Sequence, residues 1–198
     1  MILIIDNGSQ YTHLIKRSCR DLDFNAQILN AKANKIEFEK LLADKTDPLS
    51  HIILSGGPSS VYTDPPSLCS YICTLTKENK LKLPVLGICY GQQMIAHIFG
   101  AEVAKGKSAE YGFSQIFIDK EDALFSGLAT HGKSFRAWAS HFDEVKMLPI
   151  GFESLAHSEI CKFEAIKHTT KNIFGVQFHP EVWHTENGEK IIQNFLKV

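Results

Sequence analysis

The chain has 198 residues, of which 44% are hydrophobic and 22% are charged, and its formal net charge is −1. This length and composition are typical of one globular domain, so we expect residues 1–198 to form a single domain. The near-neutral charge gives no support for a nucleic-acid-binding or membrane-binding surface, and no apolar run approaches the length of a membrane span. The 5 cysteines have no paired spacing, which favours a reducing cytoplasm.

Short apolar segments alternate with helical patterns in the first half of the chain. The sequence predicts strands at 2–5, 25–29, 51–54 and 83–88, and helices at about 10–20 and 92–99. This alternation is typical of a parallel sheet covered by helices. We therefore expect an α/β fold with a flavodoxin-like, mostly parallel sheet flanked by helices.

The pattern changes after Glu102 to short apolar segments separated by turns. These segments predict strands near Val103 and at 113–118, 135–139, 153–157 and 163–167. We expect them to extend the same sheet in a more antiparallel manner. Residues 173–178 should return to the core, and residues 189–196 should form a closing helix.

The segment Gly87-Ile88-Cys89-Tyr90-Gly91 follows an apolar strand directly. It matches the G-x-S-x-G nucleophile elbow with sulfur in place of oxygen. In such a turn the glycines permit close backbone packing, and the dipole of the following helix favours a thiolate. The alternative is a small buried cysteine with glycines that serve packing alone, and the elbow by itself does not decide between the two.

A cysteine nucleophile needs a base and a group that orients the base. His179 follows an apolar strand, and Glu181 stands two residues later, with Pro180 between them disfavouring a helix. In extended backbone, residues i and i+2 point the same way, so the carboxylate can support the imidazole. A lone histidine is more often structural, but the elbow and the His-Pro-Glu segment together favour catalysis by Cys89, His179 and Glu181.

A third motif is Ser55-Gly56-Gly57-Pro58 at the end of the strand at 51–54. Its glycines allow backbone amides to turn toward a ligand, and the amides of Gly57 and Tyr90 would suit an oxyanion hole. The alternatives are a plain turn and the pyrophosphate loop of ATP pyrophosphatases. The second is disfavoured because Ser59 stands where an aspartate is expected and Pro58 lacks an amide proton.

No metal site is expected. His179 and Glu181 have the spacing of the zinc deaminase motif, but no Pro-Cys-x-x-Cys follows. Glu181 and His184 have the spacing of a carboxylate-bridged metal pair, but no second copy of that pair occurs.

Taken together, the GGP turn, the cysteine elbow and the terminal His-Pro-Glu resemble the class I (triad-type) glutamine amidotransferases over essentially the whole chain. The resemblance implies hydrolysis of glutamine to glutamate through a cysteine thioester, with transfer of ammonia to a synthetase site. It implies that Cys89 is the nucleophile, His179 the general base and acid, and Glu181 the orienting group. It also assigns the oxyanion hole to Gly57 and Tyr90, and glutamine binding to Gln93 and to a loop of Ser140, His141 and Phe142.

Within that family, four segments resemble the glutaminase of GMP synthetases: residues 6–17, 109–112, 140–145 and 174–188. Phe142 and His13 depart from bacterial relatives, which often carry glycine and glutamine there. The resemblance implies a separate ATP-pyrophosphatase subunit that binds ATP, magnesium and XMP, and no cofactor in this chain. We expect the docking face at Ser9, Tyr11, Asp143 and the His184-Thr185 turn.

Other functions stay open at this stage. They are a glutaminase for another synthetase, such as anthranilate synthase, a stand-alone γ-glutamyl hydrolase, and a non-catalytic scaffold. The intact set of Cys89, His179 and Glu181 argues against the scaffold. No ATP-pyrophosphatase segment follows Glu181 in these residues, so we expect the separate-subunit form, an excised domain of a longer chain being the other possibility.

Overall fold

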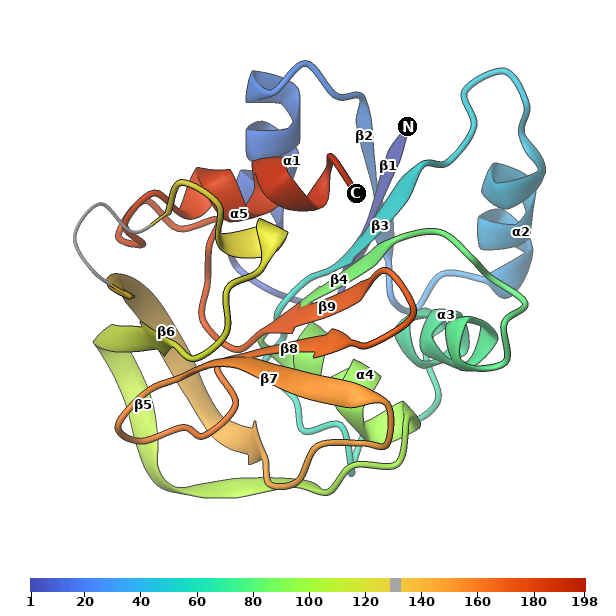
Figure 1. Cartoon of the computed structure of the whole chain (residues 1–198). Coiled ribbons are helices and arrows are strands. Elements are labelled where there is room, and N and C mark those ends of the chain that lie inside the picture. The colour runs from blue at the N-terminus through green and yellow to red at the C-terminus, as the bar shows by residue number, and fades with distance from the viewer. Residues whose placement is uncertain (129–132) are drawn as a thin grey trace.

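The computed structural model describes residues 1–128 and 133–198. These residues contain one sheet with the strand order β2-β1-β3-β4-β9-β8-β7-β5-β6 (Figure 1). The strands are β1 (Ile2–Asp6), β2 (Ala26–Asn30), β3 (His51–Leu54), β4 (Val85–Ile88), β5 (Val103–Ile118), β6 (Ser134–Val145), β7 (Phe152–His157), β8 (Ala165–His168) and β9 (Ile173–Val176). The helices are α1 (Thr12–Asp21), α2 (Lys35–Ala43), α3 (Leu68–Lys77), α4 (Tyr90–Ile98) and α5 (Gly188–Phe195), with a 3₁₀ turn at Ala123–Phe125.

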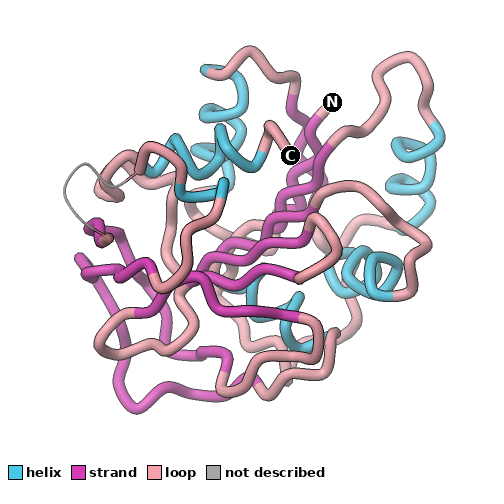
Figure 2. Tube along the Cα trace, in the orientation of Figure 1, coloured by secondary structure: helices cyan, strands magenta, loops and turns pink. Residues whose placement is uncertain are grey.

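The parallel half of the sheet consists of β2, β1, β3, β4 and β9. Every residue of β3, β4 and β9 is buried, because helices cover both faces. Figure 2 shows these strands crossing the middle of the molecule with helices on either side. The predicted parallel strands lie within two residues of the observed ones at each end.

Two hydrophobic clusters fill the two faces of the sheet. The first contains the buried side chains of α1 and α5, and the second those of α2, α3 and α4. Figure 1 accordingly shows α1 and α5 together on one side of the parallel strands. Of these helices, neither α2 nor α3 is among the ranges predicted above; α2 buries only Phe38 and so carries a weak periodic signal.

The remaining strands pair antiparallel, from β9 through β8, β7 and β5 to β6. This confirms the expected antiparallel extension and the predicted fold class. Two details differ from the prediction. The strands expected near Val103 and at 113–118 form one strand, β5, and the strand expected at 135–139 continues to Val145.

The segment expected to be a loop, 140–142, therefore lies inside β6. Ser140 pairs with Tyr111 and His141 pairs with Glu110, on the neighbouring strand β5. The pairing partner is distant in sequence, so nothing in the local pattern reveals it.

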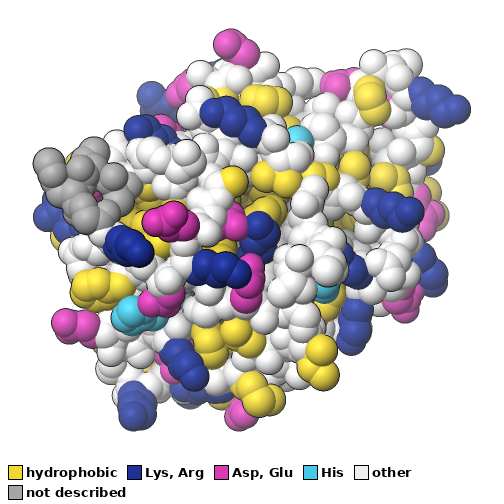
Figure 3. Space-filling view, viewed as in Figure 1, with side chains coloured by type: hydrophobic (Ala, Val, Ile, Leu, Met, Phe, Trp, Pro, Cys, Tyr) yellow, Lys and Arg dark blue, Asp and Glu magenta, His cyan; other side chains and the backbone are white. Residues whose placement is uncertain are grey.

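No helix in the described ranges is long and apolar enough to cross a membrane. On the face drawn in Figure 3, positive and negative side chains are interspersed.

Candidate active site

Cys89 occupies the sharp turn between β4 and α4, and its backbone is strained. Its φ is 50° and its ψ is −106°, a combination that side-chain-bearing residues rarely adopt. Its N–H donates to the carbonyl oxygen of Val176 on β9 at 2.8 Å, which fixes the turn to the sheet. Strain of this kind persists only where the surroundings enforce it, as in a nucleophile elbow.

The two glycines of the elbow are sterically required. A Cβ on Gly87 would lie 2.4 Å from the carbonyl carbon of Gly91, and a Cβ on Gly91 would lie 2.4 Å from the carbonyl oxygen of Leu54. Backbone atoms cannot move aside as a flexible side chain can. The sequence therefore places glycines there because α4 packs directly on the ends of β3 and β4.

His179 and Glu181 form a buried pair just after β9. The His179 Nδ1 and Glu181 Oε1 atoms are 2.9 Å apart, and the side chains are 5% and 0% exposed. Burial alone would lower the pKa of His179, but the Glu181 carboxylate and the Cys89 thiol raise that pKa well above its usual value. The pair therefore makes the imidazole a stronger base toward the Cys89 thiol, with its Nδ1 held by the carboxylate.

The backbone of this segment is held as firmly as the side chains. The His179 N–H donates to the Trp138 carbonyl oxygen at 2.9 Å, and the Thr185 hydroxyl donates to the His179 carbonyl oxygen at 2.6 Å. The Tyr11 ring packs edge-on against the imidazole, with ring centres 5.2 Å apart. These contacts leave the imidazole one orientation.

Cys89 and His179 meet beside Gly56. A Cβ built on Gly56 would lie 3.0 Å from His179 Cε1 and 3.6 Å from Cys89 Cβ. A cavity of about 310 Å³ opens at this point, lined by Gly8, Ser9, Gln10, Tyr11, Gly57, Pro58, Cys89, Ser140 and His179. The structure thus assembles the predicted thiol, imidazole and carboxylate at one cavity, from segments far apart in the sequence.

The two predicted oxyanion donors also adjoin Cys89. Gly57 lines the cavity, and Tyr90 begins α4, so its N–H has no partner within the helix. Within residues 1–128 and 133–198, neither of these amides donates to another protein group. Both are therefore free to bind an oxygen that develops negative charge.

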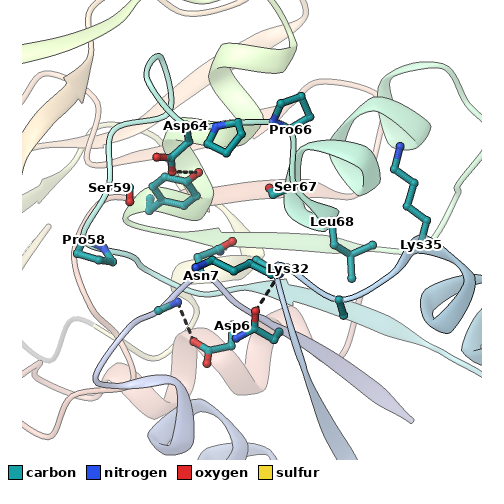
Figure 4. A pocket seen from close by; sticks show the side chains of 16 residues that line it. Asp6, Asn7, Lys32, Lys35, Pro58, Ser59, Asp64, Pro66, Ser67 and Leu68 are labelled. Carbon is teal, nitrogen blue, oxygen red and sulfur yellow. Dashed lines mark hydrogen bonds between the residues drawn. The ribbon is translucent and has the colours of Figure 1, made fainter.

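The Tyr90 side chain points away from Cys89. Its hydroxyl donates to Asp64 Oδ2 at 2.9 Å, and burial, followed by this bond, raises the pKa of the phenol. The ring borders a second cavity of about 650 Å³, in which Pro58 and Ser59 lie at one end and Lys35 at the other (Figure 4). This larger cavity contains neither Cys89 nor His179.

Of the four residues expected to bind glutamine, one lines the cavity that contains Cys89, and the other three lie in other surroundings. Ser140 lines the Cys89 cavity, and its carbonyl oxygen lies 4.0 Å from Cys89 Sγ. The Gln93 amide nitrogen is already bonded, to the Asp143 carbonyl oxygen at 2.7 Å and to Gln177 Oε1 at 3.1 Å. His141 points into a buried cluster, and Phe142 is 44% exposed. Glutamine binding by these residues stays a prediction.

The predicted docking residues also differ in position: some line the cavity, and one is buried. Ser9 and Tyr11 line the cavity with Cys89, as does Gln10, which the sequence did not single out. The position of this loop at the C-terminal end of β1, beside the GGP turn, is the signal that could have identified Gln10. Thr185 is 4% exposed, so its placement on an exposed docking face is wrong. Its hydroxyl supports His179 instead.

Comparisons with known proteins agree with this geometry. The family model described as "Glutamine amidotransferase class-I" matches residues 3–198. The A subunit of the glutamine-hydrolyzing GMP synthase of Methanocaldococcus jannaschii is 46% identical over 100% of this chain and 97% of its own length. The protein of the same name from Pyrococcus abyssi is 46% identical over 100% of this chain and 98% of its own length.

Solved structures show the same fold. A crystal structure from Thermoplasma acidophilum, provisionally assigned as the A subunit of a GMP synthase, superposes with a TM-score of 0.83 at 32% identity and covers 99% of this chain and 92% of its own. A glutamine amidotransferase from Thermotoga maritima gives a TM-score of 0.73 at 26% identity and covers 91% of this chain and 76% of its own. The chain belongs to the class I glutamine amidotransferase family.

Proposed function

We propose that this protein is the glutamine-hydrolysing subunit of GMP synthase, which releases ammonia for the ATP-dependent amination of XMP on a separate subunit. The observation that carries the proposal is the Cys89-His179-Glu181 arrangement at a nucleophile elbow. The full-length relatives named as the A subunit of GMP synthase, at 46% identity, favour this synthetase over others.

The first half of the reaction forms a thioester. His179 takes the proton of the Cys89 thiol at the ring nitrogen that does not face Glu181, and the sulfur attacks the carboxamide carbon of glutamine. The amides of Gly57 and Tyr90 bind the oxyanion of the tetrahedral intermediate. The carbon–nitrogen bond then breaks, and His179 gives its proton to the nitrogen, which leaves as ammonia.

The second half regenerates the thiol. His179 takes a proton from water, and the resulting hydroxide attacks the thioester carbon. The carbon–sulfur bond breaks, glutamate leaves, and His179 returns the proton to Cys89. Glu181 keeps the imidazole oriented and stabilises its charged form in both halves.

The partner in this proposal is an ATP-pyrophosphatase subunit that holds ATP and magnesium. An exposed aromatic patch near the cavity suits such docking: Tyr111, Phe113 and Trp183 are 77%, 57% and 83% exposed. Trp138 and His184 join the patch together, with ring centres 4.7 Å apart. The Trp138 carbonyl oxygen also accepts the His179 N–H, so a partner on this patch would lie close to the catalytic imidazole.

We also place the reaction in the cytoplasm. All 5 cysteines are free and buried, which suits a protein that folds in a reducing compartment.

The test is a glutaminase assay of the purified chain with and without the ATP-pyrophosphatase subunit, XMP and ATP. Glutamine-dependent GMP formation only when both subunits are present would support the proposal. Activation by an anthranilate synthase subunit instead would indicate another synthetase. Cleavage of γ-glutamyl peptides without any partner would indicate a stand-alone hydrolase.

A further inference from the structure

A buried cluster of ionisable side chains lies next to the strand segment that faces Cys89. It comprises Glu110, His141, Cys161 and Glu164, and one polar atom of each lies within 4.8 Å of the others. The catalytic mechanism uses none of these four side chains. Their burial nevertheless demands an account, because uncompensated charge in a protein interior is costly.

His141 has an acceptor at each ring nitrogen. Nδ1 lies 3.2 Å from the carbonyl oxygen of Asp143, which can only accept, so Nδ1 carries a proton. Nε2 lies 3.0 Å from Oε2 of Glu110. If Glu110 is ionised, Nε2 must also carry a proton, and His141 is then an imidazolium.

The two glutamates have opposite environments. Burial opposes ionisation of Glu110, but hydrogen bonds, including those of His141 and Ser114, hold the pKa of Glu110 at about 2. Glu164 is 0% exposed, and neither of its oxygens has a donor in the described part of the chain. Burial and the nearby Glu110 charge raise the pKa of Glu164 well above its usual value.

We propose that Glu110, His141 and Glu164 form an electrically neutral positioning unit for the substrate segment of β6. In this unit His141 is an imidazolium, Glu110 is its carboxylate partner, and Glu164 is a neutral carboxylic acid that donates its proton to Glu110. The proton gives the otherwise unpartnered Glu164 a hydrogen bond and leaves one positive and one negative charge, in contact.

The unit acts through the backbone of β6. His141 holds the Asp143 carbonyl oxygen directly, and the Gln93 amide binds the same oxygen from α4. Ser140 precedes His141, and its carbonyl oxygen is the atom that faces Cys89 Sγ. Fixing the His141 ring therefore fixes the edge of the cavity that Ser140 lines, where the proposed function places glutamine.

A metal ion is the competing explanation, because His, Cys and Glu are zinc ligands. Burial strongly raises the pKa of the Cys161 thiol, and the nearby Glu144 and Glu110 carboxylates add to this effect, which opposes the thiolate that zinc requires. The 3.0 Å contact between His141 and Glu110 also already satisfies both groups. His141 Nε2 also lies 3.9 Å from Glu164 Oε1.

The direct test is nitrogen NMR of the ¹⁵N-histidine-labelled full chain, with His141 assigned from the spectrum of His141→Gln. We expect the spectrum to show a proton on both His141 ring nitrogens, because each of them faces an acceptor. Glu164→Gln should keep this signature, since an amide replaces a neutral acid. Glu110→Gln should lose this signature, and the surface variant Glu153→Gln is the control.

A neutral His141 in the unmodified protein, or loss of the signature in Glu164→Gln, would overturn the proposal.

A metal analysis of the same sample separates the competing explanation. One equivalent of zinc that a chelator removes, with a change in the His141 signals, would also overturn the proposal. Neither readout requires glutaminase activity, so the unit can be tested even if the proposed function fails.

The kinetic arm rests on the proposed function. Glu164→Gln should retain glutaminase activity within about threefold, whereas Glu110→Gln should lower kcat by about tenfold or more with its circular dichroism unchanged. Equal losses in the two variants would contradict the assignment of charge to Glu110 alone. If Glu110→Gln does not fold, the nitrogen NMR spectrum of the unmodified protein and the comparison of Glu164→Gln with Glu153→Gln still test whether the proposed unit exists.

Discussion

The Asp143 carboxylate accepts a hydrogen bond from the Ser60 hydroxyl, although the two residues are 83 positions apart in the sequence. The same carboxylate accepts the Tyr62 hydroxyl at 3.1 Å. Asp143 lies on β6, and Ser60 lies three residues after Gly57. This bond therefore ties the loop that carries Gly57, one of the predicted oxyanion donors, to the strand that carries Ser140.

Asp143→Ala should reduce glutaminase kcat, because releasing the loop lets the Gly57 amide move away from the oxyanion position. Loss of one oxyanion donor raises the activation free energy by up to about 3–4 kcal/mol. Partial release of the loop should therefore lower kcat by about 10- to 100-fold. Steady-state kinetics would measure the loss. Tyr62→Phe is the matched control: it removes only the longer, exposed bond and should stay close to the unmodified rate. An unchanged kcat in Asp143→Ala would show that the loop does not depend on this bond.

Cys89→Ala should abolish glutamine-dependent GMP formation and leave ammonium-dependent synthesis by the partner intact. The thiol only supplies ammonia, so the partner's own chemistry does not need it. Mass spectrometry should also find that a glutamine-like diazo-ketone labels Cys89 before the other cysteines, such as Cys19, which is 0% exposed. Residual glutaminase activity in Cys89→Ala would refute the nucleophile assignment.

Glu181→Gln should be milder than His179→Ala. The histidine transfers protons in each half-reaction, whereas the carboxylate orients the ring and stabilises its charge. Loss of the orienting carboxylate in a related triad costs about four orders of magnitude, so we expect a large but incomplete loss of kcat. A fully active Glu181→Gln would assign the orienting role to another group.

The stability of the His179-Glu181 pair should depend on pH. The pKa of His179 is raised in the folded state. The pair therefore contributes fully to the free energy of unfolding below the unfolded-state pKa of histidine, about 6.5, and this contribution is lost as pH rises through the folded-state pKa. The free energy of unfolding lost in Glu181→Gln should therefore be largest below about pH 6.5 and should shrink as pH rises. Urea unfolding at several pH values measures this difference. Glu153→Gln, which removes a surface pair with Lys120, is the control, and its loss in free energy of unfolding should not change with pH. If the loss in Glu181→Gln did not change with pH either, the proposed effect of the His179 pKa on stability would be contradicted.

Glutamine hydrolysis should rise when the partner docks with XMP and ATP bound. Ammonia released into neutral water becomes protonated and cannot act as a nucleophile, so hydrolysis should wait for an acceptor. A rearrangement at the Gly56-Gly57 turn is the expected switch. Moving one amide into the oxyanion hole would increase the rate of glutamine hydrolysis by at least about tenfold. Equal steady-state rates with and without the partner and nucleotides would favour a stand-alone hydrolase.

Much of the catalytic arrangement could be predicted from the sequence because its signals are local. The elbow needs glycines on both sides of Cys89, and His179 and Glu181 share one short extended segment. The parallel strands are continuous apolar runs, so their positions could also be identified. In each case the physical requirement acts within a few residues.

The partners of β5 and β6 were decided only by the tertiary structure. Nothing near 140–142 indicates a strand, because its stability comes from the pairing of Ser140 and His141 with residues 110–111 and not from its own propensity. The protonation of the Glu110-His141-Glu164 cluster likewise depends on burial and on three segments meeting in space. By itself the sequence determined the fold class and the family and placed the candidate reactive residues, since those follow from local patterns. Which atoms surround Cys89, and which of the predicted glutamine-binding residues reach its cavity, depended on long-range packing that no single segment specifies.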